Sequence, residues 1–233
     1  MSVFLVGGGW SDAAAHDMFG GFVVAAAAHA GRRPPRVLLV VMGVDDEARE
    51  YHERFVRVLG RVGVSDLRVE RVAEGSSLDP AVLDGSDALV VGGGSMPAYH
   101  AALEPAYPRI RELVRSGLPY AGFSAGAAIA ATTAIVGGWL LDGVPVCPEE
   151  SNEDLGPVTV VEGLGLVEGA VDVHAAQWGN LSRLVAAVGA GLVPSGVALD
   201  ECTTLLPDGD VAGAGRVWRV SPGSNGIVVT RSR

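Results

Sequence analysis

The first 135 residues alternate short apolar segments with longer segments in which apolar residues recur at helical spacing. The segments 3–6, 37–42 and 88–91 are continuously apolar, which is typical of strands buried on both faces of a parallel sheet. Because helical segments separate most of these strands, we expect an α/β fold with a mostly parallel central sheet and helices on both faces. The predicted strands here are 3–6, 37–42, 66–72, 88–91 and 119–123, and the predicted helices are 13–30, 45–59, 97–115 and 125–135.

The pattern changes after residue 137. Glycine and proline are scattered through 137–169, around one short β-like segment at 158–161. A strand at 171–174 and a helix at 177–188 follow. The closely spaced apolar runs 197–199, 203–206, 217–220 and 227–230 then predict β-hairpins toward the C-terminus. No linker or repeat interrupts the chain, so we interpret residues 1–233 as a single domain, and we leave open whether 137–169 is a lid.

Charge and composition narrow the function classes. The net charge is −10 and the pI is near 4.9, which argues against nucleic acid and anionic membranes as partners. No apolar run reaches the roughly 18 residues of a membrane span, and the first residues lack the basic region of a signal peptide. Cys147 and Cys202 have no metal-ligand spacing. We therefore expect a cytoplasmic protein without a metal or organic cofactor.

The segment Gly122-Phe123-Ser124-Ala125-Gly126 lies between a predicted strand and a predicted helix. In a G-x-S-x-G turn of this kind the serine hydroxyl projects above the carboxyl edge of the sheet. The N–H of Ala125 then faces an oxyanion that develops beside the serine. The pattern predicts that Ser124 is a catalytic nucleophile. The alternative is a close-packed turn in which Ser124 caps the following helix.

Two glycine loops follow predicted strands at the same edge of the sheet. In Gly92-Gly93-Gly94-Ser95, the amide of Gly93 or Gly94 is a candidate for the second oxyanion donor, and phosphate binding is the alternative. We interpret Gly7-Gly8-Gly9 as a structural turn. Neither loop matches the phosphate-binding or dinucleotide-binding fingerprints.

A serine nucleophile needs a base and an acid that orients the base. His174 is the only one of the five histidines that follows Ser124, and it ends a predicted strand, so we assign it as the general base. Glu201 also follows a predicted strand and is the preferred acid, with Asp200 and Asp172 as alternatives. The order serine, histidine, acid differs from the serine, acid, histidine order of α/β-hydrolases.

Several segments together resemble the family that contains cyanophycinase and peptidase E, an α-aspartyl dipeptidase. They are Gly92–Gly94, 122–128, 163–166, 171–174 with 180–184, and 196–205, in the order of the family. The resemblance implies a fold similar to class I glutamine amidotransferases, with serine where those enzymes carry cysteine. It also implies Ser124 as nucleophile, His174 as base and Glu201 as the third member.

The chain differs from this family at positions that are expected to contact the substrate. Ala175 stands where many members have an aromatic residue, and Ser95-Met96 replaces an Asn-Gln or Asp-Gln pair. Of several arginines beyond the histidine, Arg183 is kept. We expect substrate contacts from Ser95, Gln177 and Arg183. Arg183 is the candidate for binding a substrate carboxylate, because a guanidinium binds a carboxylate well. The alternative for Arg183 is a surface position on a helix.

These features predict a serine peptidase that hydrolyses small peptides, with a preference for dipeptides that begin with aspartate. One alternative is an amidotransferase-like binding or regulatory protein without turnover. Another is an esterase or amidase with the same three residues, and a nicotinamide-dependent enzyme is a more distant one. Small peptides are the expected partners, and we allow for a homodimer.

Overall fold

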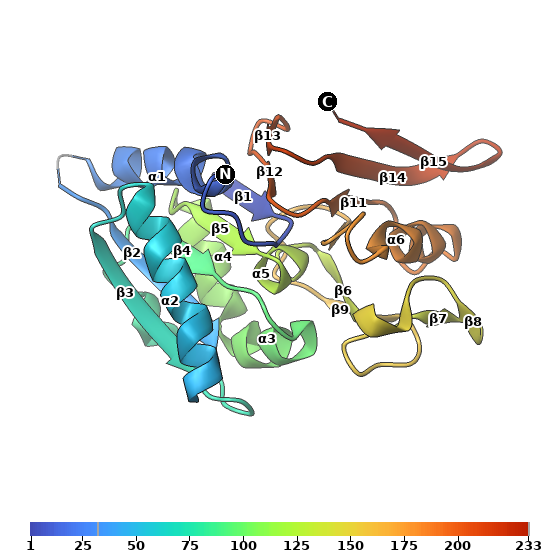
Figure 1. Ribbon diagram of the computed structural model, residues 1–233, viewed down its shortest axis with the longest axis horizontal. Helices are drawn as coiled ribbons and strands as arrows, with labels where there is room; N and C mark the ends of the chain where they lie inside the picture. Colours follow the sequence, from blue (N-terminus) through green and yellow to red (C-terminus); the bar gives the residue numbers. More distant parts are fainter. Residues whose placement is uncertain (32, 233) are drawn as a thin grey trace.

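The computed structural model describes residues 1–31 and 33–232, and a seven-stranded sheet forms the centre of this part of the chain (Figure 1). Its strand order is β13-β12-β1-β5-β4-β2-β3, in which the five strands from β1 to β3 run parallel and β12 and β13 are antiparallel additions. The strands are β1 (Val3–Val6), β2 (Arg36–Met42), β3 (Asp66–Val72), β4 (Ala88–Val91), β5 (Tyr120–Phe123), β12 (Thr203–Leu205) and β13 (Val211–Gly213).

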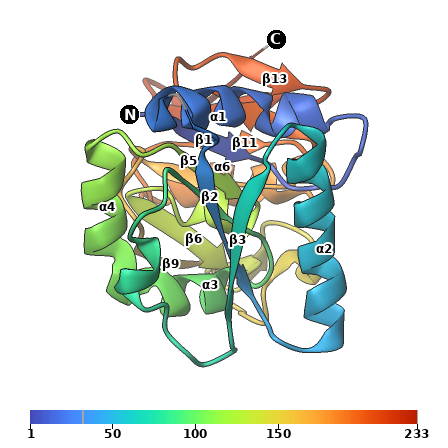
Figure 2. The same cartoon turned by 90° about the vertical axis from the view of Figure 1, so that its left-hand side faces the viewer.

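Helices cover both faces of this sheet (Figure 2). Along β2, Leu38 and Val40 belong to one hydrophobic core, whereas Leu39 and Val41 belong to the other. This alternation is what a strand buried on both faces requires. The helices α1 (Ala15–Ala30) and α2 (Asp46–Arg61) pack on one face, and α3 (Met96–Leu103), α4 (Tyr107–Arg115) and α5 (Ala125–Ala128) pack on the other. The predicted α/β architecture is confirmed.

A second sheet extends the molecule beyond β12 (Figure 1). It has the order β10-β11-β14-β15, with β10 and β11 parallel and the remaining pairs antiparallel. Its elements are β10 (Ala170–Asp172), β11 (Gly196–Leu199), β14 (Val217–Gly223) and β15 (Gly226–Arg231), and α6 (Asn180–Gly189) packs against them. The expected C-terminal hairpins are therefore present.

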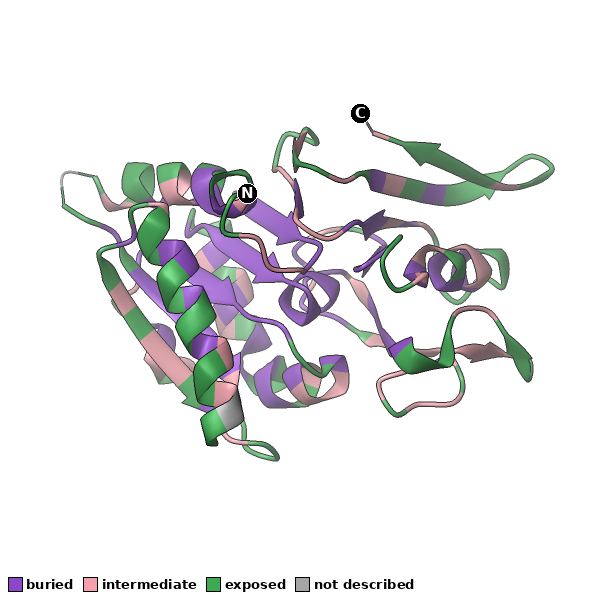
Figure 3. Ribbon diagram, in the orientation of Figure 1, coloured by how far each residue is buried: buried purple, intermediate pink, exposed green. Residues whose placement is uncertain are grey.

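Two further antiparallel pairs are formed by β6 (Thr133–Gly137) with β9 (Thr159–Glu162) and by β7 (Leu140–Leu141) with β8 (Val144–Pro145). Short 3₁₀ turns complete the chain: η1 (Pro80–Leu83), η2 (Glu104–Ala106) and η3 (Glu149–Ser151). Burial is concentrated in the strands of the central sheet and in the helix residues that pack on it, while the outer face of α2, β15 and the turn after β7 are largely exposed (Figure 3). No helix among the described residues is long and apolar enough to cross a membrane.

One predicted helix is wrong beyond its first turn, and another is interrupted. The segment 125–135 is helical only over the single turn α5, and residues 133–137 form β6. The alanines favour a helix, but the β-branched residues that follow them fit a strand, and β9 supplies the backbone partners. The segment 97–115 is divided into α3, η2 and α4, because Pro105 lacks the N–H that a continuous helix needs.

A buried ion pair joins α6 to β10. The guanidinium of Arg183 is fully buried and donates to both carboxylate oxygens of Asp172, at 3.0 and 2.8 Å. It also donates to the backbone carbonyls of Ser151 at 2.8 Å and Gly138 at 3.4 Å, so it fixes the segment between β6 and β9. All of these contacts are internal. The expected role of Arg183 in holding a substrate carboxylate is therefore wrong, and so is the alternative of a surface arginine.

We predict that Arg183→Met destabilises the protein by about 3–5 kcal/mol, because it leaves the buried carboxylate of Asp172 without a counter-charge. The double variant Arg183→Met with Asp172→Leu recovers most of that loss, because no buried charge remains. Chemical denaturation measures both free energies of unfolding. Equal losses in the single and double variants would contradict the prediction.

Candidate active site

Ser124 occupies a strained turn at the end of β5. Its backbone is left-handed, with φ 50° and ψ −110°, and α5 begins at the next residue. A Cβ on Gly122 would lie 2.3 Å from the carbonyl oxygen of Gly126, and a Cβ on Gly126 would lie 2.3 Å from that of Val91. Both glycines of the motif are needed because the backbone passes too closely for a side chain.

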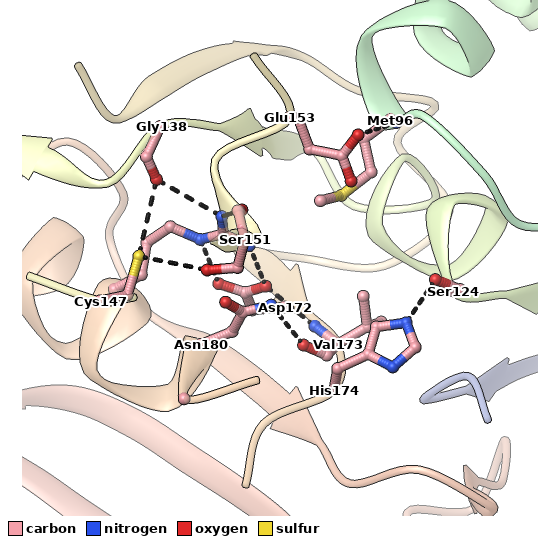
Figure 4. Close-up of polar contacts among 12 residues, drawn as sticks. Met96, Ser124, Gly138, Cys147, Ser151, Glu153, Asp172, Val173, His174 and Asn180 are labelled. Atoms are coloured by element: carbon pink, nitrogen blue, oxygen red, sulfur yellow. Dashed lines mark hydrogen bonds and ion pairs between the residues drawn. The ribbon is translucent and has the colours of Figure 1, made fainter. Parts of the chain in front are cut away.

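Three side chains from three strand ends form a continuous hydrogen-bonded chain. The Oγ of Ser124 lies 2.8 Å from Nε2 of His174, and Nδ1 of His174 lies 2.7 Å from Oε1 of Glu201. Figure 4 shows the His174 ring turned toward Ser124. Because a carboxylate only accepts hydrogen bonds, Nδ1 carries the proton, and Nε2 is free to accept the proton of the serine hydroxyl.

The other two candidate acids have different partners. Asp172 binds Arg183, as described above. Asp200 accepts hydrogen bonds from the backbone N–H of Ala176 and of Arg216 and from the indole N–H of Trp218. Of the three acids, Glu201 is the one that the structure places against His174.

Burial sets the charge state of the histidine. It lowers the pKa of His174 below the ordinary value of 6.5, while the hydrogen bond and negative charge of Glu201 act in the opposite direction. The burial effect is the larger one, so the imidazole is neutral at pH 7. A neutral imidazole is the form that accepts a proton.

The Gly7–Gly9 loop packs directly against this pair. A Cβ on Gly8 would lie 2.2 Å from Cε1 of His174, and one on Gly9 would lie 2.6 Å from Cβ of Glu201. The carbonyl of Gly7 also accepts a hydrogen bond from the backbone N–H of His174, at 3.0 Å. The interpretation of this loop as a turn missed its contact with the site. Its position after the first parallel strand was the available signal.

Trp178 is a site residue that sequence reasoning also missed. Its ring stacks on that of His174, with centroids 3.9 Å apart and planes 8° from parallel. The backbone N–H of Trp178 donates to the carbonyl of His174 at 2.9 Å, and this turn brings the indole over the imidazole. An aromatic ring therefore lies against His174 although the next residue in the chain is Ala175.

The candidate oxyanion donors surround Ser124. A Cβ on Gly93 would lie 2.9 Å from Cβ of Ser124, so this glycine loop touches the serine. The N–H of Gly93 faces the hydroxyl oxygen of Tyr51. The N–H groups of Gly94 and Ala125 donate to no acceptor in the part of the chain that the structure describes, which leaves them free for a ligand.

These groups open into a cavity of about 820 Å³. Among its lining residues that the structure describes there are six carboxylates and no lysine or arginine; the carboxylates are Asp45, Glu74, Glu150, Glu153, Asp154 and Glu201. Ser95 lines the cavity as expected. Gln177 does not; its side-chain oxygen accepts a hydrogen bond from the N–H of Glu201 at 2.9 Å, so the expected substrate contact is replaced by support of Glu201. In residues 1–31 and 33–232, no group of three or more His, Cys, Asp or Glu side chains is arranged to hold a metal ion.

Comparisons with known proteins place this chain in a family. A peptidase from an acI-B1 Actinobacterium has a similar structure, with a TM-score of 0.70 and 18% identity over 99% of this chain and 93% of its own. A Listeria monocytogenes EGD-e protein assigned to peptidase E has a TM-score of 0.54 and 16% identity, over 100% of this chain and 98% of its own. At these identities the likeness concerns the fold. No curated protein matches the chain. Residues 25–212 match the family profile of peptidase family S51, and we conclude that the chain is a member of this peptidase family.

Proposed function

We propose that this peptidase uses Ser124 as its nucleophile, His174 as its general base and Glu201 as the acid that orients the base. The observation that carries the proposal is the hydrogen-bonded chain from Ser124 through His174 to Glu201 at the wall of the cavity. Each of the three comes from the carboxyl end of a different strand, where parallel sheets position catalytic groups.

In the first half of the reaction, Nε2 of His174 takes the hydroxyl proton of Ser124 while Oγ adds to the carbonyl carbon of the scissile bond. The oxyanion accepts hydrogen bonds from the N–H groups of Ala125 and Gly94, and each such donor lowers the barrier by about 3 kcal/mol. We prefer Gly94 to Gly93 here because the N–H of Gly93 faces Tyr51. The carboxylate of Glu201 stabilises the imidazolium of His174, which then protonates the departing amine.

In the second half, water enters in place of the amine. His174 removes a proton from this water, the resulting hydroxide adds to the acyl carbon, and the C–O bond to Ser124 breaks. The peptide acid leaves and the serine regains its proton. The indole of Trp178 stacks on the imidazole of His174. The π-face of the indole stabilises the charged form of the imidazole.

We propose short peptides, dipeptides in particular, as substrates. A cavity of about 820 Å³ is in the range of sites that enclose small ligands. An N-terminal aspartyl preference requires groups that bind a second carboxylate. The described lining residues include no lysine or arginine that could bind it. An esterase or amidase activity at the same three residues is the second candidate, because an acyl-enzyme forms equally from an ester.

We predict that Ser124→Ala lowers kcat for a dipeptide panel by about 10⁴-fold or more, because the nucleophile is lost. The same variant no longer reacts with a fluorophosphonate, which labels wild type at Ser124. Ser116→Ala, at the exposed end of α4, is the control and keeps full activity. Wild-type rates in Ser124→Ala would show that the nucleophile is another group, and absence of labelling in wild type would favour a binding protein without turnover.

The pH dependence follows from the state of His174. Because burial lowers the pKa of His174, kcat/KM falls only as the pH drops below about 6.5, the ordinary histidine value. Glu201→Gln removes a charge that raises this pKa, so the acid limb moves to still lower pH while kcat decreases. Rate profiles from pH 4 to 9 measure both effects, with exposed Asp208→Asn as the control. A limb that moves upward in Glu201→Gln contradicts the assignment.

We predict that Gly8→Ala lowers kcat by at least about 100-fold, because the new Cβ displaces the His174 ring by steric overlap. Gly191→Ala is the matched control: its φ of 73° carries a similar left-handed strain, but no atom lies within 4 Å of the added Cβ. Steady-state kinetics and thermal unfolding of both variants separate the two effects. Equal activity in the two variants would show that the contact with His174 is unimportant.

A further inference from the structure

The carboxylates around the cavity are not equivalent. Asp45, Glu74, Glu150 and Asp154 are exposed, and the side chain of Asp45 already caps α2 by accepting from the N–H of Ala48. Exposed carboxylates are solvated and contribute a general negative potential. Glu201 is engaged by His174. This leaves Glu153 as the partly buried carboxylate of the lining that has no role in the reaction steps.

The carboxyl group of Glu153 contacts the beginning of α3, where the side chain of Ser95 and the backbone N–H of Met96 donate hydrogen bonds to it. Its Oε2 accepts a hydrogen bond from the backbone N–H of Met96, at 3.3 Å, at the first turn of α3 (Figure 4). Burial raises the pKa of its carboxyl, and the hydrogen bond from Met96, the positive charge of Arg183 and the hydrogen bond from Ser95 oppose this only in part. The nearby positive charge of Arg183 is already paired with Asp172. A cation that binds beside such a partly buried carboxylate stabilises its charged form.

The backbone holds Glu153 in a fixed place. Arg183 donates to the carbonyl of Ser151, and the side chain of Asn152 accepts from the N–H of Asp154, so both sides of Glu153 are anchored. These contacts restrain the backbone on both sides of Glu153, which reduces the cost of ordering this segment when a ligand binds. Arg183 thus influences the cavity by holding this segment.

We propose that Glu153 determines the charge of the substrate: its carboxylate binds a cationic group, an ammonium or guanidinium, of a peptide whose scissile bond lies at Ser124. This inference rests on the proposed peptidase function and specifies its substrate class. The free amino terminus of a dipeptide is one source of the cation, and a lysine or arginine side chain is the other. The negative lining, with no lysine or arginine among its described residues, disfavours acidic side chains at the same place.

Binding to the Ser124→Ala protein tests this assignment without turnover. Isothermal titration calorimetry compares Ala-Phe, N-acetyl-Ala-Phe and N-acetyl-Lys-Phe on Ser124→Ala and on Ser124→Ala with Glu153→Gln. We expect Glu153→Gln to weaken Ala-Phe, N-acetyl-Lys-Phe or both by at least tenfold, and to leave N-acetyl-Ala-Phe unchanged. Loss for Ala-Phe identifies the amino terminus as the cation, and loss for N-acetyl-Lys-Phe identifies the side chain.

Glu149→Gln, which removes an exposed carboxylate from the same segment outside the cavity lining, is the matched control and keeps wild-type affinity. Thermal unfolding checks that Glu153→Gln folds like the parent protein. Equal affinities of the two Ser124→Ala backgrounds for both cationic peptides would overturn the proposal. So would an effect that disappears in the presence of a chelator, since the carboxylate would then act through a bound metal.

In the active protein, Glu153→Gln raises KM for the affected peptide by at least tenfold and changes kcat by less than threefold. This split separates the two proposals. Normal kcat and KM in Glu153→Gln, together with loss of activity in Ser124→Ala, would reject the role of Glu153 and keep the peptidase mechanism. Activity that survives in Ser124→Ala would reject the mechanism, while the binding experiment would still decide on Glu153.

Discussion

The buried ion pair between Asp172 and Arg183 connects two segments that line the cavity, the one that carries His174 and the one that carries Glu153. Asp172 ends β10 two residues before His174, and Arg183 belongs to α6, which packs on the second sheet. The same guanidinium binds the backbone at Gly138 and Ser151. A fully buried guanidinium is tolerable only when its donors are matched, and here an anion and two carbonyls match them. One residue thereby fixes the histidine strand and the acidic segment relative to each other.

Close backbone approach is the second constraint. Ser124 sits on a turn where Gly122 and Gly126 leave no room for a side chain, and Gly8 and Gly9 pass equally close to the histidine and the glutamate. Parallel strands bring their carboxyl ends to one edge, but a 2.8 Å contact between serine and histidine also requires that the intervening loops be thin. The glycines therefore allow Ser124 and Glu201 to lie within hydrogen-bonding distance of His174.

Two carboxylates of the cavity, Glu201 and Glu153, have different electrostatic surroundings. Burial keeps the imidazole of His174 neutral, and in the proposed mechanism Glu201 stabilises the charge that His174 acquires with the serine proton. On another wall Glu153 holds a negative charge that no cation of the described lining balances. In the proposed mechanism, Glu201 stabilises a charge that appears during the reaction, and in the further proposal Glu153 binds a charge that arrives with the ligand.

The sequence by itself determined the parallel sheet, the strand ends and the elbow at Ser124, because these follow from local apolar patterns and from glycines at fixed spacing. It also ranked Glu201 above the other acids. Only the tertiary structure decided that Ala125–Ala128 is a single helical turn, since β9 draws the following residues into a sheet. The tertiary structure also shows that Arg183 is buried and that Trp178 and Glu153 line the cavity. A side chain's partner depends on which distant segment packs beside it, and the order of residues does not contain that information.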